Sequence, residues 1–373
     1  MTAFLTLTVG LYGILLLFFT LGLYLTKEKK TDRQPFVTVV IPARNEKEHI
    51  ETVLHDVTHQ TYPINLYEII VVDDESEDIT PNLVRVFAER HPNLRLLSSA
   101  DGDPNLKYKK RPLDVGIRAA SGEIILQTDA DCRVTSRWIE TMVSYFTPEV
   151  GMVIGHSQIE ANGSTAQHVE ALDFLMLSAA GRSTAQYGVP FAATGQNLAF
   201  RKEVFLQVGG FSPFADALGG DDTFLLQSIK NKSPWEIAIA LDRQSFSRTS
   251  PSLSFSAFIS QRIRWASDSL FFRKANPLFF FVIVTTFLTN FLILISLAEI
   301  LFSVGSTTTL TNCLIVKFLA EGFLMAKATN MFDKRELRQV FLPWFLFQIP
   351  YVVYMGIVTA TVRDQQWGGR HQG

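Results

Sequence analysis

Apolar stretches without a charged residue lie near both ends of this 373-residue chain, and they limit its possible folds more than any other feature. Residues 4–26 form the first stretch, and Lys27, Lys29 and Lys30 follow it directly. A run of this length can cross the hydrocarbon core of a membrane as a helix. A cleaved signal peptide would instead carry its positive charges ahead of the apolar run. We therefore expect a retained membrane anchor over residues 1–33.

Three further apolar segments lie toward the C-terminal end of the chain. Residues 278–298 and 340–362 are uncharged, whereas residues 310–326 contain Lys317 and Glu321. Because these two side chains are four residues apart, they lie on one face of a helix and can pair inside a bundle. The segments predict a membrane region with two or three spans, one of which is atypical.

Basic residues beside the apolar segments predict the orientation of the chain in the membrane. Lysines follow the first segment, and a second basic group follows the third: Lys327, Lys334, Arg335 and Arg338. Since Lys and Arg gather in cytoplasmic loops, we expect the polar middle of the chain in the cytoplasm, at the cytoplasmic (inner) membrane. The expected C-terminal boundaries are a membrane region at residues 277–363 and a tail at residues 364–373.

Charge, cysteine content and glycine motifs exclude several classes of function. The net charge is -2, so no concentrated basic surface points to a nucleic-acid partner. Cys132 and Cys313 lie in unrelated regions and indicate neither a disulfide framework nor a zinc site. The glycine-rich loops that cradle dinucleotides and ATP are missing from the sequence. Together with the apolar segments, their absence excludes a soluble dehydrogenase.

The polar middle of the chain alternates short β-branched runs with stretches of helical period. We expect strands at residues 37–41, 68–72, 94–97 and 123–128, and helices at residues 50–57, 79–89 and 113–119. Such alternation predicts an α/β fold, a mostly parallel sheet covered by helices. We place this domain at residues 34–253.

Polar clusters follow three of the expected strands. Residues 42–46 come after the first, Asp73 and Asp74 after the second, and Asp129 and Asp131 after a later one. In parallel sheets the ligand sits beyond the carboxyl ends of the strands, so the three loops together predict a site. Taken singly, each cluster has a plainer explanation, because Asp and Asn often end strands and cap helices.

Asp129 and Asp131 flank one small residue at the end of an apolar strand. Two carboxylates placed in this way can share one Mg²⁺ or Mn²⁺, which prefers oxygen ligands and can also take phosphate oxygens. Such a cation would offset the charge that grows on a departing diphosphate. A basic run upstream fits either diphosphate contacts or a solvated charged surface: Lys107, Lys109, Lys110 and Arg111.

Two further segments carry candidate chemistry. Asp221 and Asp222 precede an apolar helix, where Asp222 fits either a helix cap or a general base. Residues 254–276 predict an amphipathic helix at the membrane surface. It carries Gln261, Arg262, Arg264 and Trp265, and its arginines suit lipid headgroups or a diphosphate.

Taken in order, these motifs resemble the membrane-bound branch of glycosyltransferase family 2, which includes cellulose, hyaluronan and poly-N-acetylglucosamine synthases and ceramide glucosyltransferases. The matching pieces are Ile41–Glu46, Val72–Ser76, Lys109 with Leu113, Thr128–Asp131, Gly195–Asn197, Asp221-Asp222 and Gln261–Trp265. The resemblance implies a GT-A fold and an inverting transfer from a nucleotide-diphosphate sugar, a UDP-sugar or a similar donor.

The resemblance also implies a role for each matching position. Contacts to the base and ribose are implied for Pro42, Ala43, Asn45, Glu46, Asp73 and Asp74. Lys109 would lie near the diphosphate, and Asp129 and Asp131 would bind donor and metal. Asp222 would be the general base, with Asp221 as its neighbour. The segment that closes over diphosphate and acceptor would comprise Gln261, Arg262, Arg264 and Trp265.

Two positions depart from the family pattern. Glu75 stands where the family usually has glycine, which questions the geometry of that loop, and Asp221 stands where glutamate is more common. The family usually keeps its C-terminal tail in the cytoplasm, so one C-terminal segment should be re-entrant or interfacial. Pro343 and Pro350 favour the last segment for this exception.

Three functions remain open on the sequence. The first is transfer of one sugar to a membrane lipid, which the small number of apolar segments favours over a polymer channel. The second is a processive polysaccharide synthase with a glycan acceptor. The third is a membrane protein that only binds nucleotide sugar, although the acidic pair and the Gln261–Trp265 segment have no obvious use in pure binding.

Overall fold

The computed structural model describes residues 1–25, 28–215, 217, 219, 221–267, 271–303, 305–361, 365–367 and 370–372. Its centre is a seven-stranded mixed sheet in the order β3-β2-β1-β4-β8-β6-β9. The strands are β1 Val37–Ala43, β2 Tyr67–Asp73, β3 Leu94–Ser98, β4 Ile124–Gln127, β6 Val150–Ile154, β8 Leu198–Arg201 and β9 Glu236–Ile239. β3, β2, β1 and β4 run parallel, and β8 is antiparallel to both of its neighbours. The predicted α/β fold with a largely parallel sheet is confirmed.

Helices cover both faces of this sheet. They are α2 Ile50–Thr58, α3 Thr80–Ala88, α4 Lys110–Ala119, α5 Trp138–Val143, α6 Thr165–Gln186, α7 Lys202–Gln207 and α8 Asp221–Lys232. Val37, Val39 and Ile41 of β1 face the core under α2, α3 and α5, while Val40 faces the core under α4. All four are fully buried, as expected for a strand covered on both faces. Apolar runs of this kind are why the sequence predicted the strands.

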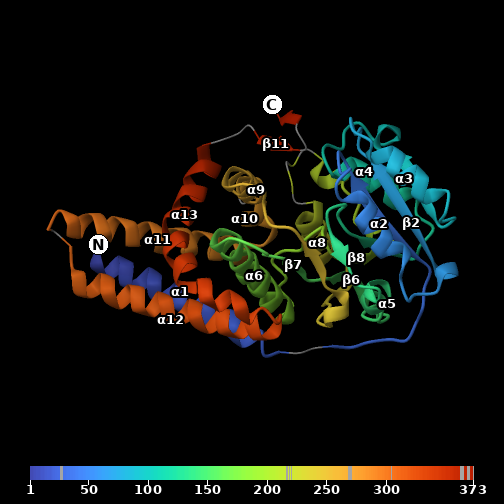
Figure 1. Cartoon of the computed structure of the whole chain (residues 1–373). Coiled ribbons are helices and arrows are strands. Elements are labelled where there is room, and N and C mark those ends of the chain that lie inside the picture. The colour runs from blue at the N-terminus through green and yellow to red at the C-terminus, as the bar shows by residue number, and fades with distance from the viewer. Residues whose placement is uncertain are drawn as a thin grey trace.

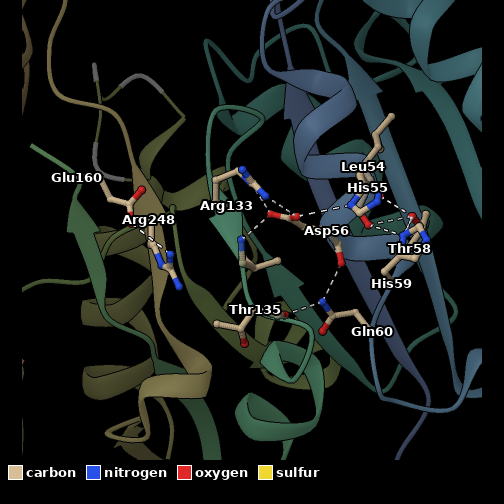
Figure 2. Close-up of polar contacts among 11 residues, drawn as sticks. Leu54, His55, Asp56, Thr58, His59, Gln60, Arg133, Thr135, Glu160 and Arg248 are labelled. Carbon is tan, nitrogen blue, oxygen red and sulfur yellow. Dashed lines mark hydrogen bonds and ion pairs between the residues drawn. The ribbon is translucent and has the colours of Figure 1, made fainter. Parts of the chain in front are cut away.

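A small second sheet holds the segment that follows Asp131. It consists of β5 Arg133–Val134, β10 Ser247–Thr249 and β7 Ser157–Ile159. Asp56 of α2 accepts two bonds from the Arg133 guanidinium, at 2.6 and 3.0 Å, and one from the Val134 amide (Figure 2). Gln60 donates to the carbonyl of Thr135 at 2.8 Å (Figure 2). The chain just after the Asp129–Asp131 loop is therefore tied to α2.

Within the described residues, four helices are long and apolar enough to cross a membrane. They are α1 Thr2–Gly22, α11 Pro277–Leu301, α12 Thr307–Met331 and a C-terminal unit formed by the 3-10 turn η6 Arg335–Val340 and α13 Phe341–Thr361. α1, α11 and α12 run side by side, whereas α13 lies across them (Figure 1). Between this bundle and the sheet lie α9 Phe255–Ser267 and α10 Phe272–Ala275 (Figure 1). A short hairpin, β11 Gln365–Trp367 with β12 Arg370–Gln372, follows α13, and the rest of the expected tail lies outside the described residues.

A buried polar cluster joins three of the membrane helices. Lys317 and Glu321 of α12 form the predicted pair, with 2.7 Å between the ammonium and one carboxylate oxygen. The Tyr12 hydroxyl of α1 donates to the same oxygen at 2.7 Å, and Lys317 donates to the Gln348 amide oxygen of α13 at 2.6 Å. Lys317 and Glu321 are fully buried, so their charges are met inside the bundle instead of facing lipid.

Candidate active site

The loops after β1 and β2 meet at the carboxyl edge of the sheet. The Asp74 amide donates to the carbonyl of Ala43 at 2.8 Å, and the Arg44 guanidinium donates to the carbonyl of Asp74 at 2.5 Å. The Asp74 carboxylate is buried and accepts a bond from the Ser99 hydroxyl at 2.6 Å. Asp73 is less buried, and its Oδ1 has no hydrogen-bond partner among the described residues. Oδ2 of Asp74 likewise has no hydrogen-bond partner among the described residues, but Asp73 is the more exposed of the two aspartates and is therefore better placed for a ligand.

The β2 loop keeps its turn although glutamate stands where glycine is expected. Glu75 adopts a φ of 56°, in the left-handed region that favours glycine. Asn45 adopts a φ of 55°, and its side-chain oxygen accepts a bond from the Glu77 amide at 2.8 Å. The Asn45 amide in turn donates to the Ser76 hydroxyl at 3.0 Å. Asn45 therefore acts on the β2 loop, and Glu75 holds a strained conformation that glycine would adopt freely.

Lys109 lies at the centre of the acidic residues. Its ammonium group lies 2.5 Å from Oδ1 of Asp129, in the loop after β4. Burial lowers the pKa of Lys109, but Asp129, Asp221 and Asp222 together raise it above its usual value. Glycine at position 195 leaves room for the Lys109 ammonium group, because a Cβ there would lie 2.8 Å from its nitrogen. Lys109 thus joins the β4 loop to the start of α8. The alternative interpretation, that Lys109 belongs to a solvated charged surface, is wrong.

The other members of the basic run have separate surroundings. Lys107 is exposed, whereas Lys110 is buried and donates to the carbonyl of Ala217 at 2.5 Å. Arg111 donates to the carbonyl of Ala100 at 3.1 Å. Arg111 also lies 3.6 Å from the Glu75 carboxylate, whereas Lys109 pairs with Asp129.

Asp222 is held by two backbone amides at the start of α8. Its Oδ1 accepts from the Thr223 amide and its Oδ2 from the Gly195 amide, each at 2.6 Å. Burial and the neighbouring Asp221 raise the pKa of Asp222 to about 7, although Lys109 and both amides act in the opposite direction. A carboxylate with such a pKa can accept a proton near neutral pH. Asp222 therefore lies inside the first turn of α8, which begins at Asp221, and meets the electrostatic requirement for a base.

Glu46, Asp129 and Asp131 place excess negative charge at the edge of β4. Burial, followed by the charges of Asp131, Asp129 and Asp78, raises the pKa of Glu46 to about 8. Burial and Asp129 likewise raise the pKa of Asp131. No group of three or more His, Cys, Asp or Glu side chains in the described chain is arranged to hold a metal. Asp129 and Asp131 fit a hard divalent cation whose other ligands are water and phosphate oxygens.

The two arginines of the Gln261–Trp265 segment on α9 have different partners. Burial lowers the pKa of Arg264, while the charges of Asp129 and Asp221 act against that change, so this guanidinium faces the acidic cluster. The guanidinium of Arg262 is buried and lies 2.9 Å from the Asp173 carboxylate of α6. Arg264 therefore joins the predicted site, whereas the partner of Arg262 lies outside it.

Aromatic contacts complete the surroundings of Arg262. Its guanidinium carbon lies 4.3 Å from the centre of the Trp265 ring and 5.0 Å from that of Phe258. Trp265 itself is 43% exposed, and Gln261 is half-buried on the same helix. Arg262 thus supports the Trp265 ring from within the protein.

Two residues just before β8 have roles that the sequence did not indicate. The Gly195 amide binds Asp222, and Asn197 joins three segments under the site. Asn197 accepts from the Trp138 indole at 3.0 Å and donates to the carbonyls of His156 and Ser245 at 2.9 and 2.7 Å. The only sequence signal was the Gly195–Asn197 motif, which matched the family pattern without indicating what either residue contacts.

Comparison with known proteins places the chain among glycosyltransferases. Residues 3–370 match the family described as Glycosyl transferase family 21. Glycosyltransferase AglE of Haloferax volcanii is 35% identical over 195 residues, which cover 51% of this chain and 60% of that protein. The β-monoglucosyldiacylglycerol synthase of Trichormus variabilis is 32% identical over 123 residues, covering 32% of this chain and 25% of that protein. The matches thus span less than two thirds of these relatives.

A solved structure shares the whole architecture. The mannosyltransferase PcManGT from Pyrobaculum calidifontis, solved in complex with GDP-Man and Mn²⁺, aligns with 96% of this chain and 99% of its own. The TM-score is 0.64 and the sequence identity 21%, so the likeness shows the fold. The expectation of a GT-A fold with membrane helices is confirmed. Because the family match covers almost the whole chain, the protein belongs to glycosyl transferase family 21 and is a glycosyltransferase.

Proposed function

We propose that the protein transfers one sugar, with inversion, from a nucleotide-diphosphate sugar to a hydroxyl group of a membrane lipid. The observation that carries this proposal is the cluster of Lys109, Asp129, Asp221 and Asp222, which Arg264 faces from the helix next to the membrane region. A departing diphosphate needs positive charge and an attacking hydroxyl needs a base, and this cluster supplies both.

The donor nucleotide would bind at the edge formed by β1 and β2. Pro42 and Ala43 end β1 there, and Asp73 has a buried oxygen without a partner in the described chain. Asn45 shapes the neighbouring loop, while Asp74 supports it from below through Ser99. The solved relative was bound to GDP-Man, so a guanosine donor deserves the same test as the UDP-sugar that the family resemblance implies.

Asp129 and Asp131 would hold Mg²⁺ or Mn²⁺ beside the diphosphate. The fit rests on their oxygen ligands and on the crowded negative charge that raises the pKa of Glu46. When bound, the cation would neutralise charge on the leaving diphosphate. Lys109 and Arg264 add positive charge to the cluster. The solved relative contains Mn²⁺, which makes manganese the first cation to test.

Asp222 would act as the base in a single displacement. The acceptor oxygen forms a bond to the anomeric carbon as the bond from that carbon to the diphosphate oxygen breaks. The acceptor proton passes to the Asp222 carboxylate, and the nucleoside diphosphate leaves. Attack from the face opposite the leaving group inverts the anomeric centre. The Gly195 and Thr223 amides orient the carboxylate for this step.

A lipid acceptor is supported by the position of α9 beside the membrane helices. Leu253 and Phe255 at its start are 100% and 67% exposed, and Trp265 is exposed near its end. Amphipathic helices of this kind lie at the membrane surface. One relative is named for transfer to diacylglycerol, and another, from Trichomonas vaginalis, for transfer to dolichyl phosphate. Gln261 and Trp265 would line the path of the acceptor, while Arg262 holds Trp265 in place.

The helix arrangement supports an expected topology with three spans. α1, α11 and α12 lie side by side and would cross the membrane. α13 lies across them (Figure 1) and would lie at the interface. With this arrangement the catalytic domain at residues 34–253, the helix at residues 254–276 and the tail at residues 364–373 share one side. Because lysines follow α1, we expect that side to be the cytoplasm. A cysteine introduced near residue 372 should react with a membrane-impermeant reagent only from the cytoplasmic face.

A donor screen tests the proposed function. Purified protein is incubated with Mn²⁺, a panel of UDP- and GDP-sugars and total membrane lipid, and the lipids are analysed by mass spectrometry. We expect one glycosylated lipid that depends on one donor. An Asp222→Asn variant is the matched control, because it keeps the side-chain shape but removes the base. A ladder of longer glycans would favour a processive synthase, and absence of any product would contradict the proposal.

A further inference from the structure

An open cavity of about 680 Å³ lies at the C-terminal half of α8, whereas Asp221 and Asp222 lie in the first turn of that helix. It is bounded by the C-terminal end of α8, by α10 and by the 3-10 turn Ser212–Phe214. This volume is within the range typical of small-molecule sites. The roles assigned above to the active-site residues do not involve the cavity.

Three cations surround the cavity. Lys232 comes from the end of α8, and Arg273 and Lys274 come from α10. All three are exposed, and none forms an ion pair within the part of the chain that the structure describes. Phe214 and Phe271 supply apolar walls beside them. The cavity therefore combines concentrated positive charge with an apolar surface, which suits an anionic and amphipathic ligand.

The cavity lies where the chain enters the membrane. Arg273 and Lys274 precede the first residue of α11 by only a few positions, and α11 is long and apolar enough to span the bilayer. Asn231 of α8 donates to the carbonyl of Ala275 at 3.0 Å, which fixes the two cationic elements relative to each other. Leu278 and Phe281 in the first turns of α11 are 38% and 44% exposed. An acyl chain can extend along these side chains while a headgroup occupies the cavity.

We infer that this cavity binds the phosphate headgroup of an anionic phospholipid. Lys232, Arg273 and Lys274 contact the phosphate, and the apolar beginning of α11 receives the acyl chains. Clusters of Lys and Arg directly beside a membrane helix recognise anionic lipids in this way. The bound lipid fixes α8, which begins with Asp221 and Asp222, relative to the membrane surface. The site is distinct from the proposed acceptor path, so the inference does not depend on the identity of the sugar or the acceptor.

Lipid retention in detergent tests the inference without any activity assay. The full-length protein is titrated with phosphatidylglycerol or phosphatidylcholine, and bound lipid is counted by native mass spectrometry. We expect one retained phosphatidylglycerol and no matching phosphatidylcholine. Each cation near an anionic headgroup contributes about fivefold in affinity, so Lys232→Ala/Arg273→Ala/Lys274→Ala should weaken retention about 100-fold.

Two control variants separate a specific site from a general charge effect. Arg85→Ala/Arg90→Ala/Arg137→Ala removes three exposed cations from the far side of the α/β domain and should leave retention unchanged. Lys232→Arg/Lys274→Arg preserves the charge and should also retain the lipid. Equal retention by Lys232→Ala/Arg273→Ala/Lys274→Ala and the wild type would overturn the inference. Displacement of the lipid by excess inorganic phosphate alone would overturn it too, by assigning the cavity to a soluble anion.

Discussion

The pair formed by Arg262 and Asp173 gives a quantitative prediction, because both side chains are buried. Arg262 is 3% exposed and Asp173 is 7% exposed, so solvent screens the pair little. Removing one partner of such a pair costs about 3–5 kcal/mol, since the other charge stays buried without compensation. Asp173 also accepts a bond from the Trp344 indole at 3.2 Å, which adds about 1 kcal/mol. We expect Asp173→Ala to lower the free energy of unfolding by about 4–6 kcal/mol.

Chemical unfolding in detergent, followed by tryptophan fluorescence, measures this loss. Glu160→Ala is a suitable control, because it breaks the exposed 3.3 Å pair with Arg248 and should cost at most about 1 kcal/mol (Figure 2). The double variant Arg262→Met/Asp173→Leu should recover most of the stability, since no unpaired charge remains. Its activity should stay low, because Trp265 has lost the guanidinium beneath its ring. A loss below about 1 kcal/mol for Asp173→Ala would refute this reasoning.

Three further predictions concern the reactive cluster and its loops. The pKa of about 7 for Asp222 predicts that kcat/KM rises with pH through neutrality. Because this pKa is raised, Asp222 contributes stability that is fully present below about pH 4 and lost as pH rises through about 7. Asp222→Asn should therefore raise the melting temperature near pH 8, and an unchanged value would contradict the assigned burial. Glu75→Gly should stabilise the protein by up to about 1 kcal/mol in thermal unfolding, because glycine adopts the positive φ freely; a clear loss would mean that the side chain itself is needed. Gly195→Ala should displace the Lys109 ammonium group, because the added Cβ would lie 2.8 Å from its nitrogen. We expect kcat to fall at least about tenfold with little change in melting temperature. Full activity would show that the position of Lys109 is not needed.

The strands and the loops at their ends could be predicted because their signals are local. Val37, Val39, Val40 and Ile41 form an apolar run because both faces of β1 are covered, and the polar residues begin where that cover ends. The Lys317–Glu321 pair could also be predicted from the sequence, since one helical turn separates its members. Each of these inferences needed only neighbouring residues and a known periodicity.

The partners of the site residues could not be predicted, because they come from distant segments. Arg262 and Arg264 look equivalent in the sequence, and only the Asp173 carboxylate of α6 separates their roles. The same holds for the bond from the Gly195 amide to Asp222, which joins the approach to β8 with the start of α8. Glu75, in place of the expected glycine, questioned the geometry of its loop, yet the residue adopts the positive φ that glycine would have. Residue type suggested the chemistry, whereas tertiary packing decided which side chains take part.

The most direct test of the account measures sugar transfer and donor binding side by side in wild type and Asp222→Asn. Both proteins are reconstituted in bilayers with Mn²⁺, the donor found in the screen and its lipid acceptor. We predict that the variant binds the donor with near wild-type affinity and forms less than about a thousandth of the product, because the displacement lacks its base. Product formation near the wild-type rate, with donor binding unchanged, would contradict the role assigned to Asp222 and the mechanism built on it.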